Sequence, residues 1–189
     1  MLAKINSATL HGIDAIPIEI EVDASKGLPT ETIVGLPDII VRESKSRIKS
    51  ALKNSGFKFP LKNYLINLAP ADVRKEGPLF DLPIAVGILE STNQINSLKN
   101  AFYIGELALN GDVRPIKGIL SICHLAKKSN INTIVLPEEN YDEASLIKNI
   151  NIIPIKNIHQ INNLNNINYI RKKSNTHTIH DSSKSHIDF

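Results

Sequence analysis

The sequence predicts an α/β fold of the α+β kind, in which helices pack on a mixed β-sheet. Two N-terminal segments, residues 3–10 and 15–25, alternate apolar with polar side chains as half-buried strands do. An Asn110-Gly111 pair between alternating flanks indicates a β-hairpin. From residue 118 onward, helix-like and strand-like segments alternate along the chain. Together these patterns indicate one mixed sheet covered by helices.

The first helix is expected between Asp38 and Gly56, after a short strand at residues 31–34. Asp38 is the expected N-cap, because an aspartate oxygen accepts a backbone N–H of the first turn. Residues that recur at about 100° per residue form one face of this helix. They are Val41, Ser44, Ile48, Ala51 and Leu52. The pattern is typical of an amphipathic helix.

A second helix is expected over residues 81–92, after an apolar strand at residues 63–70. The loop between them contains a Gly77-Pro78 turn, and Asp81 is the expected N-cap of the helix. Four charged side chains precede the turn, and we expect them to form a network that holds the loop. They are Asp72, Arg74, Lys75 and Glu76.

The second half of the chain begins with the hairpin, for which Asn110-Gly111 favours a type I′ turn. Helices are then expected over residues 118–130 and 141–149, and strands over residues 133–137 and 151–155. Apolar residues recur every three positions in residues 157–170 and favour a closing helix, although an Asn-rich disordered segment is the alternative. We therefore expect one domain over residues 1–170 and a polar tail over residues 171–189.

The composition excludes several classes of protein. With 42% hydrophobic and 22% charged residues, the chain is typical of a globular protein. It has neither an apolar run near the ~18 residues of a membrane span nor a signal peptide, so we expect a cytoplasmic protein without a membrane partner. The single Cys123 lies in an apolar helical pattern and is expected to be a buried, inert thiol.

Positive charge is concentrated in one segment. The net charge of +3 becomes nearly neutral once residues 170–189 are set aside, since the remainder holds 18 basic and 17 acidic residues. Between residues 42 and 62, however, seven basic side chains accompany the lone Glu43. Four of them form one stripe on the first helix, namely Arg42, Lys45, Lys49 and Lys53. This stripe could follow a DNA backbone, and the alternative is an ordinary solvated helix face.

Motifs of nucleotide binding and catalysis are missing from the sequence. Neither GxxxxGK[ST] nor GxGxxG occurs, and there is no GxSxG nucleophile elbow. The histidines His177, His180 and His186 lie in the polar tail, where no folded frame would fix the geometry of a zinc site. We therefore expect no catalytic, cofactor-binding or metal site in this chain.

Three segments together resemble a known family. They are "VGLPDIIVRESKSRIKSALKNSGFKFP", "INLAPADVRKEGPLFDLPIAVGIL" and "IGELALNGDVRPIKGILSICHLAKK". In this order they resemble the N-terminal domain of the magnesium-chelatase-like AAA+ ATPases, the ComM/YifB group. The resemblance implies a ribosomal-protein-S5-domain-2-like fold, similar to the proteolytic domain of Lon. It also implies an AAA+ motor after this domain, which in ComM-type proteins forms a hexameric helicase that promotes DNA branch migration during natural transformation.

The resemblance to Lon identifies two positions where catalytic residues would lie. In Lon-type proteases the loop reads approximately K-D-G-P-S-A-G with a Ser nucleophile, and P-I-G-G-L-K carries the Lys base. Here Lys75 to Pro78 match the first loop and are followed by Leu79, while Pro115 to Ile119 match the second and are followed by Leu120. A leucine can neither attack a carbonyl nor accept a proton, so a Ser-Lys mechanism is not expected.

The resemblance further implies that the residues "DF" at 188–189 begin the motor module, whose remainder is absent from this sequence. ATP and Mg²⁺ are then expected only in that module, and DNA and other ring subunits are the expected partners. The alternatives are a standalone nucleic-acid-binding or ring-assembly module, or the relic of an interrupted gene. The DNA sequence beyond the Phe189 codon would separate these possibilities.

Overall fold

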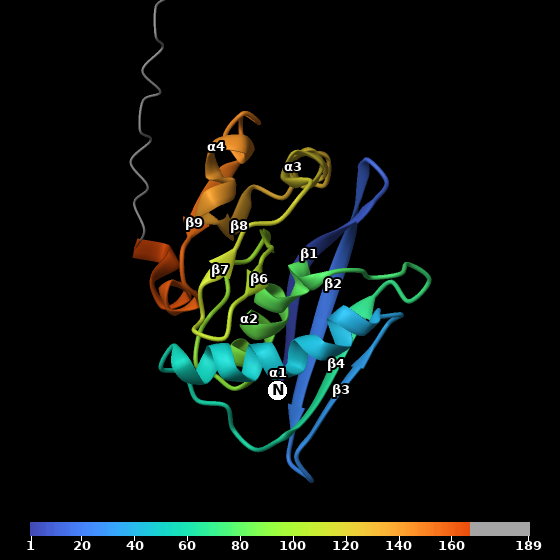
Figure 1. Ribbon diagram of the computed structural model, residues 1–189, viewed down its shortest axis with the longest axis vertical. Coiled ribbons are helices and arrows are strands. Elements are labelled where there is room, and N and C mark those ends of the chain that lie inside the picture. Colours follow the sequence, from blue (N-terminus) through green and yellow to red (C-terminus); the bar gives the residue numbers. More distant parts are fainter. Residues whose placement is uncertain (167–189) are drawn as a thin grey trace, which may run out of the picture.

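A seven-stranded mixed sheet forms the centre of the protein in the computed structural model, which describes residues 1–166 (Figure 1). The strands lie in the order β3-β4-β2-β1-β5-β8-β9. Pairing is antiparallel between β4, β2 and β1 and parallel elsewhere. The strands are β1 (Leu2–His11), β2 (Asp14–Ser25), β3 (Thr30–Val34), β4 (Asn63–Ala69), β5 (Ala101–Tyr103), β8 (Thr133–Pro137) and β9 (Asn151–Ile155). The predicted mixed α/β architecture is confirmed.

The long pair β1 and β2 runs in register from Leu2 opposite Asp23 to His11 opposite Asp14. Side chains along β2 alternate between buried and half-buried, as Ile18, Ile20 and Val22 point into the core. This alternation is the period of two that the sequence shows, and it fixes which face of the sheet the helices cover.

Four α-helices and three 3-10 helices accompany the sheet within the described part of the chain. They are α1 (Ile39–Asn54), η1 (Pro78–Phe80), α2 (Asp81–Ser91), α3 (Ile119–Lys128), η2 (Glu138–Asn140), α4 (Tyr141–Ala144) and η3 (Ile158–Asn166). Helix α2 packs on β1 and β2, and α1 crosses over α2 on the same side (Figure 1). All eleven residues of α2 are buried. None of the helices in residues 1–166 is long and apolar enough to cross a membrane.

The hairpin formed by β6 (Glu106–Leu107) and β7 (Val113–Arg114) differs from its prediction. Of the predicted type I′ pair, only Gly111 has a positive φ, of 88°. Its N–H donates to the Ala108 carbonyl at 2.9 Å, and the Ala108 N–H donates to the Asp112 carbonyl at 2.9 Å. The loop therefore has three residues, 109–111, with glycine in the left-handed position. The type I′ prediction is wrong, because the Asn110 carboxamide accepts the Asp112 N–H and closes a different local turn.

The described part of the C-terminal segment is helical, as the predicted closing helix requires. Residues 158–166 form the 3-10 helix η3, which is interrupted at Asn163. Ile158, Ile161 and Leu164 are buried, and their spacing of three residues matches the three residues per turn of a 3-10 helix. The remaining part of the predicted closing helix, and the predicted tail with its histidines, lie outside the described residues.

Candidate functional site

Helix α1 begins at a site that also holds the loop after β4. The Asp38 carboxylate accepts the Val41 N–H at 2.7 Å, which confirms the predicted N-cap. Its second oxygen accepts the Gly77 N–H at 3.1 Å. The Asp38 N–H in turn donates to the Lys75 carbonyl at 3.0 Å. One aspartate thus joins the start of the helix to the loop that enters α2.

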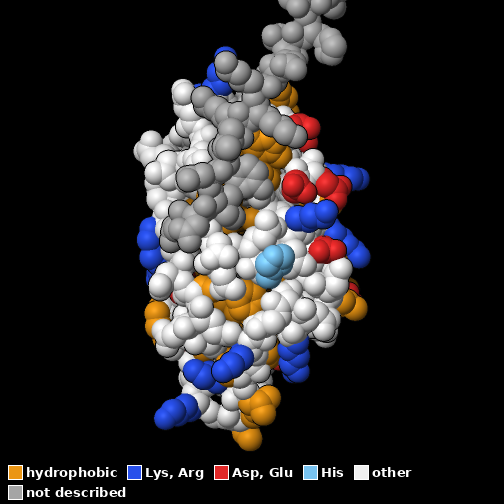
Figure 2. All heavy atoms as spheres, turned by 90° about the vertical axis from the view of Figure 1, so that its left-hand side faces the viewer, with side chains coloured by type: hydrophobic (Ala, Val, Ile, Leu, Met, Phe, Trp, Pro, Cys, Tyr) orange, Lys and Arg blue, Asp and Glu red, His pale blue; other side chains and the backbone are white. Residues whose placement is uncertain are grey.

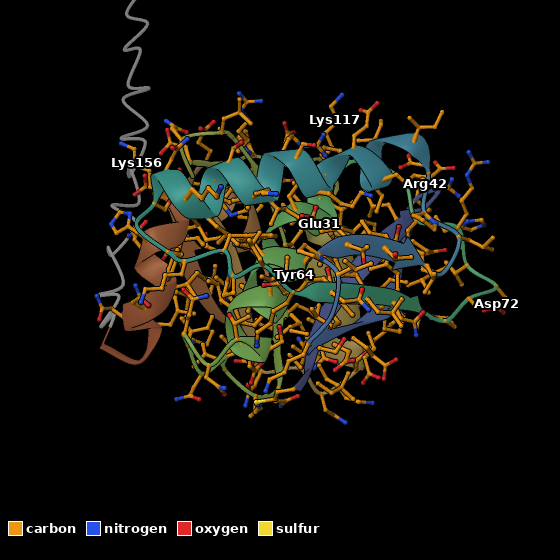
Figure 3. All side chains as sticks on the ribbon, turned by 90° about the horizontal axis from the view of Figure 1, so that it is seen from below. Glu31, Arg42, Tyr64, Asp72, Lys117 and Lys156 are labelled. Atoms are coloured by element: carbon orange, nitrogen blue, oxygen red, sulfur yellow. The ribbon has the colours of Figure 1, made fainter. Side chains whose placement is uncertain are left out.

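The predicted basic stripe lies along α1, and its two central members are held by β3. The Lys45 ammonium group donates to the Glu31 carbonyl at 2.9 Å, and the Lys49 Nζ is 3.6 Å from the Glu31 Oε1. Figure 3 shows Glu31 beneath α1 and Arg42 at one end of the helix. Arg42 and Lys53 are exposed. The four cations therefore share one side of the molecule, but only the outer two project freely from it.

An aromatic side chain, Phe59, lies next to this stripe and was not predicted from the sequence. The Lys49 Nζ is 5.4 Å from the centre of the half-buried Phe59 ring, within the range of a cation–π contact. The Phe59 ring is tilted against Tyr64, with 5.2 Å between the ring centroids. The flanking Lys58 and Lys62 were a usable signal, because basic residues interleaved with an aromatic are typical of nucleic-acid surfaces.

The side of the molecule with α4, β9 and η3 has a different charge pattern. In Figure 2 its Lys and Arg side chains lie in small separate groups, with Asp and Glu among those along one edge. In the hairpin, Arg114 forms an ion pair with Glu106 at 3.1 Å, and Asp112 lines the same pocket as Arg114. Other Lys and Arg side chains lie across the lower part of the view. The face of α1, where four cations follow one helix, is the candidate for contact with a polyanion.

Leu79, at the first of the two positions that the resemblance to Lon singles out, is a core residue. It lies in η1 and is 8% exposed. Its carbonyl accepts the Gly105 N–H at 3.1 Å, which ties η1 to the segment after β5. An apolar side chain here stabilises the fold by its burial.

Leu120, at the second position, has different surroundings. It is 37% exposed and lines a pocket of about 340 Å³ beside the turn between β1 and β2, together with Ile13, Ser121 and His124. Leu79 is not among the residues that line this pocket. The Ser121 hydroxyl donates to the Ile13 carbonyl at 2.6 Å, an arrangement that orients the hydroxyl without removing its proton.

Asp81 has a role that the sequence analysis did not foresee. The N-cap residue of α2 is Phe80, and Asp81 is the first residue of the helix, so the prediction of Asp81 as N-cap is wrong. Its carboxylate instead forms a bidentate pair with Arg47 of α1, with Nε–Oδ2 at 2.9 Å and Nη2–Oδ1 at 3.1 Å. The Leu107 N–H also donates to Oδ2, at 3.2 Å. Asp81 thereby links α1, α2 and the hairpin.

Burial dominates the electrostatics of this pair. The Asp81 side chain is 0% exposed and that of Arg47 is 23% exposed. Burial raises the pKa of Asp81 to about 6, although the hydrogen bond and charge of Arg47 act to lower it. The pKa of Arg47 is raised in turn by its hydrogen bond to Asp81. At neutral pH both side chains are therefore charged and form an ion pair.

The four charged residues of the loop split into two groups. Arg74 and Glu76 form an ion pair at 3.0 Å on the outside of the loop, with side chains 73% and 64% exposed. Lys75 is fully buried, and its ammonium group donates to the Pro70 carbonyl. Burial lowers the pKa of Lys75, while the charge of Asp72 opposes this shift. Lys75 therefore holds the loop from inside.

One prediction about a reactive group can be compared with the structure. Cys123 is buried in α3, as expected, and burial raises the pKa of its thiol to about 11. Such a thiol is almost entirely protonated at neutral pH and is a poor nucleophile. Among residues 1–166, the His, Cys, Asp and Glu side chains form no group of three that could hold a metal ion.

Comparisons with known proteins identify relatives that cover most of the chain. Residues 20–140 match the family described as subunit ChlI of Mg-chelatase. The uncharacterized protein YifB of Escherichia coli K12 is 43% identical over 148 residues, which cover 77% of this chain and 29% of the relative. The competence protein ComM of Haemophilus influenzae is 42% identical over 152 residues, which cover 79% of this chain and 30% of the relative.

A more distant similarity connects the chain to proteases. A Lon protease of Aster yellows witches'-broom phytoplasma is 28% identical over 165 residues, which cover 81% of this chain and 21% of that protein. The chain spans less than a third of the length of these three relatives.

Proposed function

The chain belongs to the family of subunit ChlI of Mg-chelatase, and we propose that it is the non-catalytic N-terminal domain of a ComM-type AAA+ ATPase that remodels DNA. The observation that carries this proposal is the 42% identity to the competence protein ComM over 79% of the chain. ATP and Mg²⁺ would bind in the AAA+ module of such a protein. The domain described here would contribute contacts to DNA or to neighbouring subunits in the cytoplasm.

The expectation that the domain itself is not catalytic rests on side-chain chemistry. Leu79 and Leu120 occupy the positions that resemble the Lon nucleophile and base, and neither has an ionisable or nucleophilic atom. Ser121 lies next to Leu120, but its hydroxyl donates to a backbone carbonyl. We expect no hydrolysis of a fluorogenic casein substrate by the purified chain. Hydrolysis that survived repurification and disappeared in Ser121→Ala would contradict this part of the proposal.

The proposed DNA contact is the stripe of α1. Arg42 and Lys53 project from the helix, and Lys45 and Lys49 lie between them at the edge of β3. The test is a triple variant with Lys45, Lys49 and Lys53 changed to Glu, assayed with labelled single-stranded and branched DNA. We expect weaker binding and a flatter dependence on salt, because fewer counterions are released.

A matched control uses three exposed lysines elsewhere, Lys127, Lys128 and Lys148. Changing them to Glu alters the net charge by the same amount and leaves α1 intact. Equal losses in both triple variants would indicate a general charge effect and would contradict a specific role of α1. Unchanged binding in the α1 variant would contradict it as well.

A second candidate function, assembly with other ring subunits, is favoured by one observation. Three large apolar side chains lie exposed near the start of α1, namely Leu36 at 54%, Ile39 at 75% and Ile40 at 43%. Clustered exposed apolar residues are typical of protein interfaces. Sedimentation velocity over a concentration series would reveal self-association, and replacement of Ile39 and Ile40 by Ser should abolish it. A monomer at all concentrations would count against an assembly role for the isolated domain.

The proposal for the whole protein can be tested by sequencing the gene beyond the Phe189 codon. A reading frame that continues past the Phe189 codon to GxxxxGK[ST] would place this domain ahead of an AAA+ module. Branch-migration assays could then compare the full protein with a variant that lacks residues 1–166. Equal rates with and without these residues would contradict a role of the domain in DNA remodelling. A stop codon at that point would contradict the proposal for this polypeptide.

A further inference from the structure

We propose that Glu31 competes with DNA for Lys49. Its carboxylate pairs with the Lys49 ammonium group, which a DNA phosphate would otherwise contact. The residue would thereby set the affinity of α1 for DNA. This inference rests on the proposed DNA contact of α1 and adds to it a named acidic residue from a different element.

The geometry places one acidic residue beside the centre of the stripe. Glu31 lies in β3 at the edge of the sheet, beneath α1 (Figure 3). Its Oε1 atom is 3.6 Å from the Nζ of Lys49, and its backbone carbonyl accepts a hydrogen bond from the Nζ of Lys45 at 2.9 Å. The side chain of Glu31 therefore engages Lys49, whereas Lys45 is held by the backbone.

The contact between Glu31 and Lys49 is partly open to solvent and can exchange. The Lys49 side chain is 40% exposed and that of Glu31 is 24% exposed. A partly exposed pair with a single contact at 3.6 Å contributes little to stability, and its carboxylate can be replaced by another anion. The Arg47–Asp81 pair on the opposite flank of the helix is different, because its carboxylate is fully buried and held by two hydrogen bonds from the guanidinium group.

Phe59 keeps the Lys49 ammonium group close to the surface after the carboxylate has been displaced. The aromatic ring lies 5.4 Å from Nζ and offers a site for the cation that carries no negative charge. A phosphate oxygen can accept the same N–H bonds as a carboxylate oxygen. Exchange of Glu31 for phosphate would thus leave Lys49 in nearly the same position and free a cation for DNA.

The variant Glu31→Gln separates this role from a structural one. It removes the carboxylate charge but retains the backbone carbonyl that holds Lys45, so only Lys49 is released. We expect the affinity for a fluorescein-labelled oligothymidine, measured by anisotropy, to rise about twofold to fivefold. The slope of log affinity against log salt should become steeper by about 0.7, the value for one additional phosphate contact with single-stranded DNA.

The matched control is Glu43→Gln. Glu43 is an exposed acidic residue of α1 itself, and this change alters the net charge by the same amount without touching Lys49. A double variant, Glu31→Gln with Lys49→Gln, completes a double-mutant cycle. In the Lys49→Gln background, the change at Glu31 should bring no more gain than Glu43→Gln does.

The outcomes distinguish this inference from the proposed DNA contact. If the triple Lys-to-Glu variant of α1 loses binding while Glu31→Gln and Glu43→Gln behave alike, the role of Glu31 is overturned and the DNA contact stands. If no variant binds DNA and the native chain does not either, both are overturned. An increased affinity with a steeper salt slope only in Glu31→Gln supports both.

Discussion

Helices α1 and α2 lie against each other and both have an aspartate at their start, yet the two aspartates act differently. Helix α1 buries one face and exposes the other, and Asp38 caps its own helix. Helix α2 is buried along its whole length, and Asp81 reaches across to Arg47 of α1. Both aspartates connect separate segments of the chain, since Asp38 also accepts the Gly77 N–H, but only Asp38 caps its own helix, whereas Asp81 pairs with a cation of the neighbouring helix.

The largest effect is expected from breaking the link between the two helices. Arg47→Met would leave the buried Asp81 carboxylate with only the Leu107 N–H as a donor. An unpaired buried charge should lower the free energy of unfolding by about 3 kcal/mol at pH 7, measured by urea denaturation. The matched control is Arg114→Met, which breaks the more exposed pair with Glu106 and should cost less than about 1 kcal/mol. Equal losses in the two variants would show that burial does not distinguish the pairs.

The same pair predicts how stability depends on pH. Burial raises the pKa of folded Asp81 to about 6, whereas the unfolded carboxyl titrates near its ordinary value of 3.8. The folded state therefore binds this proton more readily than the unfolded state does. Its contribution is fully present below about pH 4 and is lost as the pH rises through about 6.

Removal of Arg47 should raise this pKa further, since Arg47 lowers it in the native chain. The stability deficit of Arg47→Met should consequently shrink between pH 7 and pH 4. Urea denaturation of both proteins at these two values measures this difference, and Asp81→Asn, which cannot titrate, serves as the control. A deficit that stayed constant, or grew, on acidification would mean that Asp81 does not carry the effect.

The second largest effect concerns the close packing of α2 on the sheet. A Cβ atom at Gly87 would lie 2.5 Å from Cγ2 of Val22 in β2, closer than van der Waals contact allows. Gly87→Ala should lower the free energy of unfolding by about 1–2 kcal/mol, because the clash outweighs the gain in helix propensity. Ser46→Ala on the exposed side of α1 should change it by less than about 0.5 kcal/mol. Addition of Val22→Ala to Gly87→Ala should reduce the penalty of the glycine change, and a penalty that persists unchanged would contradict the clash.

The two helices also differ in how many of their contacts could be predicted from the sequence. For α1, the N-cap and all five buried residues were predicted, because its cap and its amphipathic pattern are encoded within one segment. For α2, the helix itself was predicted but not the partner of Asp81. Arg47 is 34 positions away in the sequence, and nothing local indicates which cation will approach the carboxylate.

Two other differences have the same physical origin. The hairpin signal at Asn110-Gly111 correctly located the turn but not the loop type, because side chains from distant segments also hold the loop: Asn54 donates to the Leu109 carbonyl at 2.7 Å and Asn157 to the Asn110 carbonyl at 3.3 Å. In the candidate site, the basic stripe was visible as a helical pattern. Its competitor Glu31 and its neighbour Phe59 come from other elements, and only the tertiary fold brings them to Lys49.

A smaller effect should follow from removing the cap of α1. Asp38→Ala would leave the Val41 and Gly77 N–H groups without their acceptor. Loss of an N-cap typically lowers stability by about 1 kcal/mol. Thermal unfolding would measure the change, and Asp38→Ser, which can still cap the helix but has no second oxygen for Gly77, should recover most of the loss. No recovery by serine would indicate that the link to Gly77 matters more than the cap.

The smallest effect on stability is expected for a change at Lys53. An exposed residue of α1 can be changed at little cost, whereas every residue of α2 is buried. The Lys53 side chain is exposed and lies in the last turn of the helix, where a positive charge interacts favourably with the helix dipole. Lys53→Gln should therefore change the free energy of unfolding by less than about 0.5 kcal/mol.

If α1 contacts DNA, the same variant should flatten the salt dependence of binding by about 0.7 in slope, because one phosphate contact is lost. Unfolding and anisotropy measurements on one preparation would test whether Lys53 affects DNA binding without affecting the free energy of unfolding. A variant that lost stability without a change in DNA binding would assign Lys53 to the fold and remove it from the proposed surface.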